Sequence, residues 1–459
     1  MAGIQSMTRP FIFKGVAFLF NMVAVAIPLA AQSDFAGLDT FATQELARHG
    51  IPGASIAVVR ADRIVYSKVF GTANLETGEP MRPEMLVRIG STTKMFTAAA
   101  LIGLAVEGKI DLNAPVGTYL KFLPPRLSQA TANQLLSHTA GIHDAAPQYG
   151  SHDDSALGSE IRAWTDDWLF TSPGKIVSYS NPGYWLVGFL VETLTGMPYA
   201  DAMVARVFKP LGMTRTTFRP TTAMTWPLAQ GHELGAVVRP AADNAATWPA
   251  GSIFSNASEL SRFVIAFMNG GRLDGKQVLE PKVIVLMSAP HTAIPGGINT
   301  YQSYCYGLSA GEYRGVPFLE HKGERAGYGS IIRMIPERRV AVIVVTNQTG
   351  EDLPETAERA LELATPLAPK PAEVSQPAEQ ITPDDIARIA GAYQNGAGRL
   401  EIFERDHHLF GRTGAKDVEL VKNSESSYEA GNSTLTMIAG EDRRVEYVFF
   451  NARAFARTK

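Results

Sequence analysis

Residues 91–107 read STTKMFTAAALIGLAVE, an Ala-, Leu- and Met-rich run that is followed by Gly108. This composition favours an α-helix, and glycine is a typical residue just beyond a helix end. Ser91 and Lys94 stand three residues apart at the start of this predicted helix. Side chains at that spacing share one helix face, with Cβ atoms about 5–6 Å apart. The sequence therefore predicts a serine hydroxyl beside a lysine amine at a helix N-terminus.

This pair has the composition of an activated nucleophile. A serine hydroxyl becomes an effective nucleophile when a neighbouring base accepts its proton, and burial can lower the pKa of a lysine enough for it to act as that base. The positive end of the helix dipole at Ser91 favours a developing negative charge. The same spacing recurs at Ser172 and Lys175, but Pro173-Gly174 between them predicts a turn. A helix-capping serine followed by a solvated lysine is the structural alternative for residues 91–94.

Two further short motifs carry polar side chains suited to acyl transfer. Tyr179-Ser180-Asn181-Pro182 precedes a predicted helix over 184–195. A lysine ammonium nearby would lower the pKa of Tyr179, which could then accept the serine proton and return it to a leaving group. Asn181 offers an amide donor and acceptor for a substrate amide. A similar triplet, Tyr393-Gln394-Asn395, lies much later in the chain, so this motif is unspecific alone.

The third motif is His321-Lys322-Gly323, the only His-x-Gly of the sequence, just before a predicted strand over 330–335. Glycine at this position lets a substrate backbone approach the strand closely. The backbone N–H of Glu324 is then expected to form an oxyanion hole together with that of Ser91.

In this order, the three motifs resemble those of the serine β-lactamase and penicillin-binding protein superfamily, whose class A enzymes carry Ser-x-x-Lys, Ser-Asp-Asn and Lys-Thr-Gly. The Tyr-x-Asn and His-x-Gly variants are similar to the branch of class C β-lactamases, D-alanyl-D-alanine carboxypeptidases, D-aminopeptidases and family VIII esterases. Residues 135–141, 210–213, 250–252 and 258–260 are also similar to this branch. The resemblance covers roughly residues 35–365.

The resemblance implies a role for each matching residue. Ser91 would be the acylated nucleophile, Lys94 its activator and Tyr179 the acid/base residue. Asn181 would bind a substrate amide. No cofactor and no metal are implied.

On the strand side, the resemblance implies that His321 and Gly323 form a wall of the substrate site, with His321 facing a substrate carboxylate or a proton relay. Glu324 would contribute its backbone N–H. Lys322 stands where threonine is common in the family, and Glu324 where a small or neutral residue is usual, so carboxylate recognition stays open. Histidine in place of lysine at 321 favours a peptidase or esterase over a dedicated β-lactamase.

The remaining pattern predicts an α/β fold. Residues 54–59 and 64–70 form one predicted β-hairpin, and 331–335 and 340–346 form another, followed by a helix over 355–364. Terminal strands that frame a mostly helical middle indicate a sheet flanked by helices with an inserted helical region. By resemblance, this is the antiparallel β-lactamase/DD-peptidase arrangement.

The chain is expected to divide into four segments. Residues 1–31 resemble a secretory signal peptide, with Arg9 and Lys14 ahead of a short apolar run and small residues at its end. Residues 32–365 form the hydrolase domain, and 366–383 a proline-rich linker. Residues 384–459 contain runs of alternating pattern that predict a small all-β domain. This domain is similar to the lipocalin-like module of some family members. Cleavage after Ala31 is favoured over retention as an anchor, because the apolar run is short for a membrane span.

Composition excludes several classes of protein. The 459 residues are 45% hydrophobic and 19% charged, as in a globular chain, and a net charge of −3 supplies no basic field for nucleic acid. One cysteine, Cys305, excludes an intramolecular disulfide and any Cys-based metal cluster. His138 is expected to stabilise a turn, and the loop with His143, His152, Asp153 and Asp154 to be solvated rather than metal-binding.

These observations predict an exported, periplasmic or secreted serine hydrolase that acts on amide or ester bonds through an acyl-enzyme. D-amino-acid peptides, short esters and β-lactams are the candidate substrates. The alternative is a penicillin- or peptidoglycan-recognising protein that is acylated with little turnover. A third hypothesis places the function in the C-terminal β domain, which would dock the cell wall or a partner chain.

Overall fold

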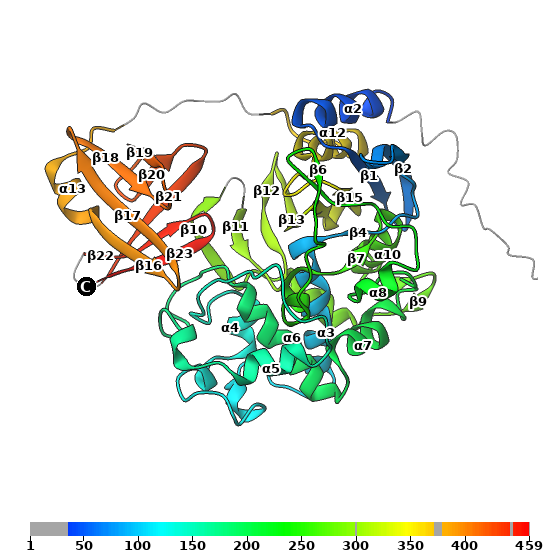
Figure 1. The fold of residues 1–459 in the computed structure, drawn as a ribbon, viewed down its shortest axis with the longest axis horizontal. Helices are drawn as coiled ribbons and strands as arrows, with labels where there is room; N and C mark the ends of the chain where they lie inside the picture. The colour runs from blue at the N-terminus through cyan, green and yellow to red at the C-terminus, as the bar shows by residue number, and fades with distance from the viewer. Residues whose placement is uncertain (1–34, 299–300, 371–378, 441–443, 459) are drawn as a thin grey trace, which may run out of the picture.

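The computed structural model describes residues 35–298, 301–370, 379–440 and 444–458. A nine-stranded antiparallel sheet with helices on both faces is accompanied by a closed eight-stranded β-barrel (Figure 1). The predicted α/β domain and C-terminal all-β domain are therefore confirmed. The expected signal peptide, and residues 371–378 of the expected linker, lie outside the described residues. Within the described ranges, no helix has the length and apolar character to cross a membrane.

The sheet joins the beginning and the end of the hydrolase domain. Its strands run in the order β10 (Thr292–Ile298), β11 (Tyr301–Tyr304), β12 (Ser309–Tyr313), β13 (Val316–Arg325), β14 (Tyr328–Ile335), β15 (Val340–Thr346), β1 (Gly53–Arg60), β2 (Arg63–Asn74) and β3 (Glu79–Pro80). Both predicted hairpins are present, as β1–β2 and β14–β15. The two hairpins meet where β1 pairs with β15, so Ala57 lies opposite Ile343 inside the sheet.

Both faces of the central strands are buried, because helices cover each of them. Ile56 and Val58 of β1 pack in one apolar cluster with residues of α2 (Leu38–His49) and α12 (Pro354–Ala364). Ala57 and Val59 face the opposite cluster, which contains α10 (Ala257–Met268). Side chains of a strand alternate between its two faces, so a sheet covered on both faces reads as an uninterrupted apolar run.

The inserted helical region comes between β3 and β10 in the chain. Most of its helices lie at the end of the domain away from α2 and α12 (Figure 1). Its central helices are α3 (Thr93–Val106) and α6 (Asn181–Thr195). The helix predicted over 184–195 begins earlier, at Asn181, because the Ser180 hydroxyl accepts the Gly183 N–H at 3.1 Å and caps the helix. The other helices are α4 (Ala132–Leu136), α5 (Ala156–Arg162), α7 (Tyr199–Met203), α8 (Pro220–Ala223), α9 (Trp248–Gly251) and α11 (Pro281–Ser288).

Three short strand pairs stabilise the loops of this region. They are β4 (Val87–Arg88) with β7 (Phe254–Ser255), β5 (His232–Glu233) with β6 (Ala236–Val237), and β8 (Arg272–Leu273) with β9 (Lys276–Gln277). The β4–β7 pair holds the segment just before Ser91 against the segment after α9.

The C-terminal domain is an up-and-down barrel preceded by the short helix α13 (Pro383–Ile389). Each strand pairs with the next, and β16 closes the barrel on β23. The strands are β16 (Gly391–Asn395), β17 (Gly398–Arg405), β18 (His408–Arg412), β19 (Asp417–Lys422), β20 (Ser427–Ala430), β21 (Ser433–Ala439), β22 (Val445–Phe450) and β23 (Arg453–Arg457). Lipocalins close an eight-stranded sheet in the same manner.

The barrel docks on the hydrolase domain through β22 and β23. Tyr447 and Phe449 pack with Ile176 and Val177, which precede α6, in one buried apolar cluster. The Tyr447 hydroxyl also lies 2.6 Å from the hydroxyl of Thr171. These contacts place one end of the barrel beside the loop that carries the Tyr179 motif.

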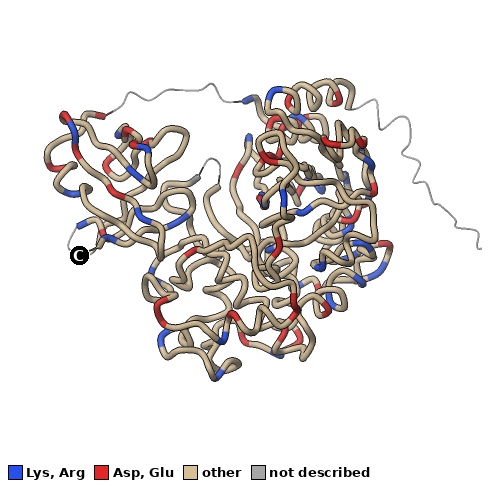
Figure 2. Tube along the Cα trace, in the orientation of Figure 1, with Lys and Arg blue, Asp and Glu red and all other residues tan. Residues whose placement is uncertain are grey.

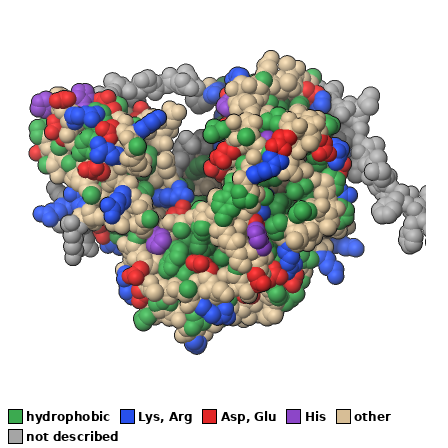
Figure 3. All heavy atoms as spheres, viewed as in Figure 1, with side chains coloured by type: hydrophobic (Ala, Val, Ile, Leu, Met, Phe, Trp, Pro, Cys, Tyr) green, Lys and Arg blue, Asp and Glu red, His purple; other side chains and the backbone are tan. Residues whose placement is uncertain are grey.

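Charged side chains of both signs are scattered over the molecule. Lysine and arginine positions and aspartate and glutamate positions both occur throughout the described part of the trace (Figure 2). On the face drawn in Figure 3, they are interspersed with apolar and uncharged polar side chains.

Candidate active site

The predicted motifs meet in one cleft of about 410 Å³. It lies between the start of α3, the end of β13, the loop before α6 and the docked barrel. Its lining contains five of the seven predicted site residues, namely Ser91, Tyr179, His321, Gly323 and Glu324. Of the other two, Lys94 is hydrogen-bonded to Ser91, and Asn181 is hydrogen-bonded to Lys94. The structure therefore brings all seven residues together.

Ser91 and Lys94 stand as the helix spacing predicts. Ser91 occupies a 3-10 turn, Gly90–Thr92, that leads into the first turn of α3. The Nζ atom of Lys94 lies 3.2 Å from Oγ of Ser91. It lies 2.7 Å from Oδ1 of Asn181 and 2.8 Å from the carbonyl oxygen of Ala250. The Lys94 side chain is fully buried, and all three of these partners are uncharged.

Burial without a charged hydrogen-bond partner destabilises the ammonium form of Lys94. Desolvation therefore lowers the pKa of Lys94 well below its ordinary value of 10.5. The negative charge of Asp144 acts in the opposite direction, and the positive charge of Arg453 acts with desolvation. The net result favours a neutral amine beside the serine hydroxyl.

Tyr179 lies over the same amine, with its ring centroid 4.8 Å from Nζ of Lys94, and hydrogen-bonds Ser91. The prediction that a lysine ammonium lowers the pKa of Tyr179 is wrong. Burial raises this pKa above its usual value of 10, and the hydrogen bond with Ser91 only partly opposes the rise. The physical reason is that both groups are desolvated, so both favour their neutral forms. Tyr179 is thus a phenol in the resting site.

The side-chain amide of Asn181 is engaged at both ends. Its Oδ1 accepts from Lys94, and its Nδ2 donates to Oδ1 of Asp144 at 3.0 Å. The backbone N–H of Asn181 donates to the same carboxylate oxygen at 2.8 Å. One N–H of the amide is left for the substrate contact that the sequence predicts.

On the strand side, glycine permits a contact within the protein. A Cβ atom on Gly323 would lie 1.9 Å from the carbonyl oxygen of Ile89, and one on Gly90 would lie 2.4 Å from the backbone nitrogen of Glu324. The turn that carries Ser91 therefore packs directly on β13. This contact brings the backbone of Glu324 beside that of Ser91, as the predicted oxyanion hole requires. The glycine at 323 serves this close packing, whereas the sequence suggested an approach by substrate.

His321 is an uncharged imidazole. Burial, together with Lys94, lowers its pKa to about 3. Its Nδ1 lies 2.6 Å from the carbonyl oxygen of Lys322, which can only accept, so Nδ1 carries the proton. Its Nε2 then accepts from the Tyr304 hydroxyl at 3.2 Å. This ring offers neither a positive charge nor a free N–H to a substrate carboxylate.

His138 lies in the cleft, and its side chain contacts the loop before α6, whereas the sequence suggested a bond within its own turn. Its Nδ1 accepts the backbone N–H of Ser180 at 3.2 Å, so Nε2 carries the proton. This Nε2 is buried and has no hydrogen-bond partner within the described residues. The imidazole lies 4.3 Å from the Tyr179 ring and 4.5 Å from the Tyr304 ring, measured between centroids.

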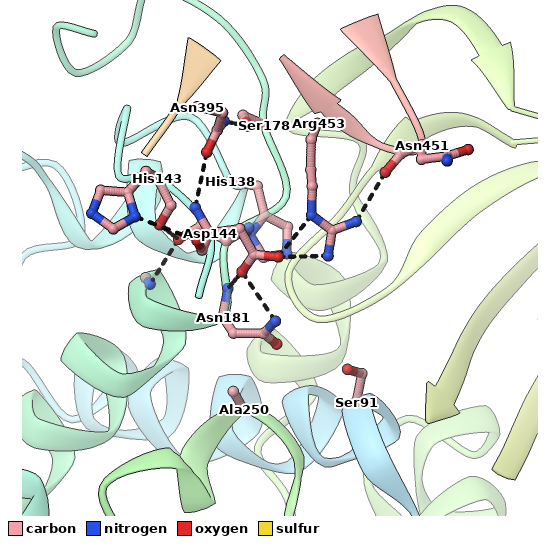
Figure 4. A network of polar contacts seen from close by, with 12 residues as sticks. Ser91, His138, His143, Asp144, Ser178, Asn181, Ala250, Asn395, Asn451 and Arg453 are labelled. Carbon is pink, nitrogen blue, oxygen red and sulfur yellow. Dashed lines mark hydrogen bonds and ion pairs between the residues drawn. The ribbon is translucent and has the colours of Figure 1, made fainter. Parts of the chain in front are cut away.

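No sequence pattern selects Asp144, Ala452 or Arg453, yet all three contact the predicted motifs. Figure 4 shows Asp144 between Asn181 and Arg453, which comes from the barrel. Ala452 and Arg453 also line the cleft. They are remote from the Tyr179 motif along the chain, and no local signal marks such a contact.

A second, narrower cavity of about 60 Å³ adjoins Ser91 on its other side. Gln148, Trp185 and Arg325 contribute to its lining, and Glu324 lines both cavities. Ser91 thus borders both a wide, partly apolar space that reaches the barrel and a small cavity of mixed lining.

The histidines and acids that could suggest a metal are engaged elsewhere. His143 stacks on Trp168 with a centroid distance of 4.5 Å, and His152 contacts Asp243 at 2.7 Å. Asp154 pairs with Arg219, and the Asp153 side chain accepts from Ser155.

One group of possible metal ligands, Glu45, His49 and Glu355, occurs in the part of the chain that the structure describes, and none of the three lines the cleft. The carboxylate of Glu45 already accepts from Glu355 N–H and from Thr356.

Comparison with known proteins agrees with this geometry. The family model described as Beta-lactamase matches residues 38–365, most of the chain. Penicillin-binding protein 4 of Amycolatopsis lactamdurans is 28% identical over 372 residues, which cover 76% of this chain and 95% of that protein.

Two solved structures extend the comparison. The crystal structure of SurE matches with a TM-score of 0.75 and 24% identity, over 93% of this chain and all of that one, and shows likeness of fold. The D-amino acid amidase from Ochrobactrum anthropi SV3, complexed with L-phenylalanine, matches with a TM-score of 0.59 and 25% identity. That match covers 71% of this chain and 98% of the amidase.

Proposed function

The chain belongs to the beta-lactamase family and is a serine hydrolase of the β-lactamase/DD-peptidase type, and on that premise we propose that it hydrolyses amide or ester bonds through an acyl-enzyme on Ser91. One observation carries the proposal. Lys94 is fully buried, has only uncharged hydrogen-bond partners and lies 3.2 Å from the Ser91 hydroxyl.

The hydrogen bonds of Lys94 support its role as the base. A neutral amine has two N–H donors and one lone pair. Asn181 Oδ1 and the carbonyl oxygen of Ala250 can only accept, so they take both donors. The lone pair is then directed at the Ser91 hydroxyl. When Ser91 attacks a carbonyl carbon, its proton passes to Lys94 as the new C–O bond forms.

The negative charge that develops on the carbonyl oxygen is stabilised by backbone N–H groups of Ser91 and Glu324. Tyr179, a phenol, then donates its proton to the leaving group as the bond from carbon to that group breaks. The Lys94 ammonium then returns a proton to the Tyr179 phenolate, whose ring centroid lies 4.8 Å from its Nζ, since Ser91 Oγ is now an ester oxygen without a proton. An ester of Ser91 and neutral Lys94 remain.

Deacylation repeats these steps with water as the nucleophile. A water molecule attacks the ester carbon while its proton passes to the same Lys94–Tyr179 pair. The bond between the carbon and Ser91 Oγ breaks, and the serine regains its proton. The reaction consumes one water per bond cleaved.

The charges around the cleft favour an uncharged leaving group. Lys322 pairs with Asp352 at 2.9 Å, Arg453 pairs with Asp144, and His321 is neutral. Glu324 lines the cleft, and no ion-pair partner for it occurs in the described ranges. We therefore favour esters and amides, D-amino-acid derivatives among them, over β-lactams, whose carboxylate would meet this unneutralised charge.

The test is mass spectrometry of the protein during incubation with a short-chain chromogenic ester, a D-amino-acid amide or a β-lactam. We expect a transient adduct on Ser91 that disappears as product forms, and no adduct in Ser91→Ala. Turnover that survives in Ser91→Ala would overturn the proposal.

A second candidate function is a binding protein that is acylated with little turnover, and the penicillin-binding relative supports it. A persistent adduct on Ser91 without product release would favour this candidate.

We also propose that the protein is exported and acts in the periplasm or outside the cell. Residues 1–31 carry the charge and apolar pattern of a signal peptide. Mass spectrometry of the intact protein from its natural compartment would find a new N-terminus near residue 32.

A further inference from the structure

The carboxylate of Asp144 connects two parts of the molecule that fold from distant segments. Asp144 lies between α4 and α5, and its side chain is only 12% exposed. Its Oδ1 accepts two hydrogen bonds from Asn181, at 2.8 Å and 3.0 Å. Its Oδ2 lies 2.7 Å from Nε and 2.5 Å from Nη2 of Arg453 (Figure 4). Both oxygens are thus engaged, one by the catalytic domain and one by the barrel.

This carboxylate fixes the orientation of the Asn181 amide. A carboxylate accepts hydrogen bonds only, so the NH₂ end of the amide must face Asp144. The oxygen end then faces Lys94 at 2.7 Å. Without Asp144, the amide could turn by 180° and present N–H groups to the amine. The hydrogen-bond pattern that directs the lone pair of Lys94 to Ser91 therefore depends on Asp144.

Arg453 in turn is held by the barrel. It follows a turn at Asn451 and Ala452, both with positive φ, and donates through Nη1 to the carbonyl oxygen of Asn451 at 3.0 Å. The carbonyl oxygen of Ala452 accepts the backbone N–H of Tyr179 at 2.8 Å. The Arg453 guanidinium lies 5.4 Å from the Tyr179 ring centroid.

Two more side chains connect the same segments. The Ser178 hydroxyl accepts from the backbone N–H of Ala454 and from Nδ2 of Asn395, both at 3.1 Å. The Oδ1 atom of Asn395 accepts the backbone N–H of Asp144 at 3.0 Å. Asn395 belongs to the later Tyr-x-Asn triplet, so this triplet connects the barrel to the site.

We propose that Arg453 is a positioning residue for the Lys94–Asn181 pair, so that docking of the barrel through the Arg453–Asp144 ion pair completes the active site. The barrel is then a part of the catalytic machinery. This inference rests on the proposed function, because it assigns the barrel a role in the same reaction.

The ion pair of Arg453 with Asp144 also affects the pKa of Lys94. Asp144 raises the pKa of Lys94, and Arg453 lowers it. The groups that face Lys94 from the surrounding elements are Tyr179, Asn181 and Tyr184 of the α6 segment, His138 and Asp144 of the segment after α4, His321 of β13 and Arg453 of the barrel. Loss of Arg453 leaves the carboxylate of Asp144 unneutralised and favours the ammonium form, which cannot accept the serine proton.

The experiment uses the full-length chain with Arg453→Met, Asp144→Asn and the double variant. We expect Arg453→Met to slow acylation of Ser91 by about 10²-fold, as small misplacements of catalytic groups do. The acid limb of kcat/KM should move to higher pH in Arg453→Met and to lower pH in Asp144→Asn. In the double variant, the acid limb should return toward the wild-type position, because both opposing charges near Lys94 are removed. The amide oxygen at position 144 can still accept from Asn181.

Two controls separate positioning from other roles of Arg453. Arg453→Lys keeps the positive charge but loses the paired Nε and Nη2 contacts with Asp144. Compared with Arg453→Met, it should therefore restore the position of the acid limb more completely than the acylation rate. Arg412→Met removes a barrel arginine that pairs with Asp417 and Glu401 outside the cleft, and it should leave both unchanged. Circular dichroism and thermal unfolding would verify that each variant is folded.

A direct titration keeps this inference separate from the proposed function. The ¹³C resonance of the Lys94 side chain, assigned with Lys94→Met in protein labelled at lysine Cε, reports the protonation of Lys94 without any substrate. If the titration midpoint of Lys94 moves up in Arg453→Met and down in Asp144→Asn, the influence of the ion pair on Lys94 is supported. This holds even in a protein that turns over none of the substrates tried. Unchanged midpoints together with unchanged acylation rates in Arg453→Met would overturn it.

Discussion

Gly90, the residue before the nucleophile, packs directly on the backbone of Glu324. Gly90 has a φ of 49°, and a Cβ built on it would lie 2.4 Å from the nitrogen of Glu324 and 2.5 Å from its oxygen. The turn that carries Ser91 can approach β13 this closely because residue 90 has no side chain. The spacing of the two proposed oxyanion donors therefore depends on a glycine that touches no substrate.

We expect Gly90→Ala to lower kcat by about 10²–10³-fold, the loss typical of a missing oxyanion donor. The added Cβ would force the Ser91 turn away from β13. Steady-state kinetics with the chromogenic ester would measure the effect. Gly108→Ala is the matched control, since Gly108 also has a positive φ of 76° but no heavy atom within 4 Å of the added Cβ. Equal activity of the two variants would contradict this account.

Lys94→Met should lower the rate of Ser91 acylation by about 10²–10⁴-fold, because it removes the amine that accepts the serine proton. The rate is measured as growth of the adduct by rapid-quench mass spectrometry. Lys109→Met, an exposed lysine just beyond α3, serves as the control and should acylate normally. Normal acylation in Lys94→Met would assign the base to another group.

The pH profile of kcat/KM should show an acid limb and no alkaline limb below pH 10. Lys94 is active as the neutral amine, so activity rises as pH increases through its lowered pKa and is lost below it. Tyr179 is active as the phenol, and its pKa is raised above 10. His321, with a pKa of about 3, adds no transition between pH 5 and 8. A profile recorded from pH 4 to 10 tests this, and an alkaline limb near neutrality would contradict it.

Tyr179→Phe should impair amide hydrolysis more than hydrolysis of an activated aryl ester. An amine leaving group must be protonated as it departs, whereas a phenolate of low basicity leaves without that proton. The ratio of kcat/KM for the two substrates should change by about 10²-fold or more. Tyr149→Phe, at an exposed position, should leave the ratio unchanged. An equal loss on both substrates would instead assign Tyr179 to the attack step.

Glu324→Gln should improve substrates whose leaving group carries a carboxylate. Removal of a like charge in a water-filled cleft corresponds to about 1 kcal/mol, or roughly a 5-fold gain in kcat/KM. The readout is the ratio of kcat/KM for a β-lactam to that for an uncharged ester. Glu312→Gln on β12, which does not line the cleft, is the control. An unchanged ratio would show that this charge does not select against β-lactams.

Much of the fold was predictable because the decisive patterns are local. The hairpins β1–β2 and β14–β15 follow from apolar runs separated by short turns, and α3 follows from its composition and from Gly108. The pairing of β1 with β15 does not follow from either hairpin alone. It joins segments from the two ends of the domain, and no periodicity within one segment encodes a partner that distant.

The sequence by itself predicted that Ser91 and Lys94 lie side by side, because the turn of Ser91 continues into α3 and residues three apart there share one face. Only the tertiary structure decided the protonation of Lys94, Tyr179 and His321, since burial sets the cost of each charge. It also decided that Arg453 of the barrel meets Asp144. The physical reason is the same in both cases: desolvation and ion pairing depend on which segments pack together, whereas spacing along a helix does not.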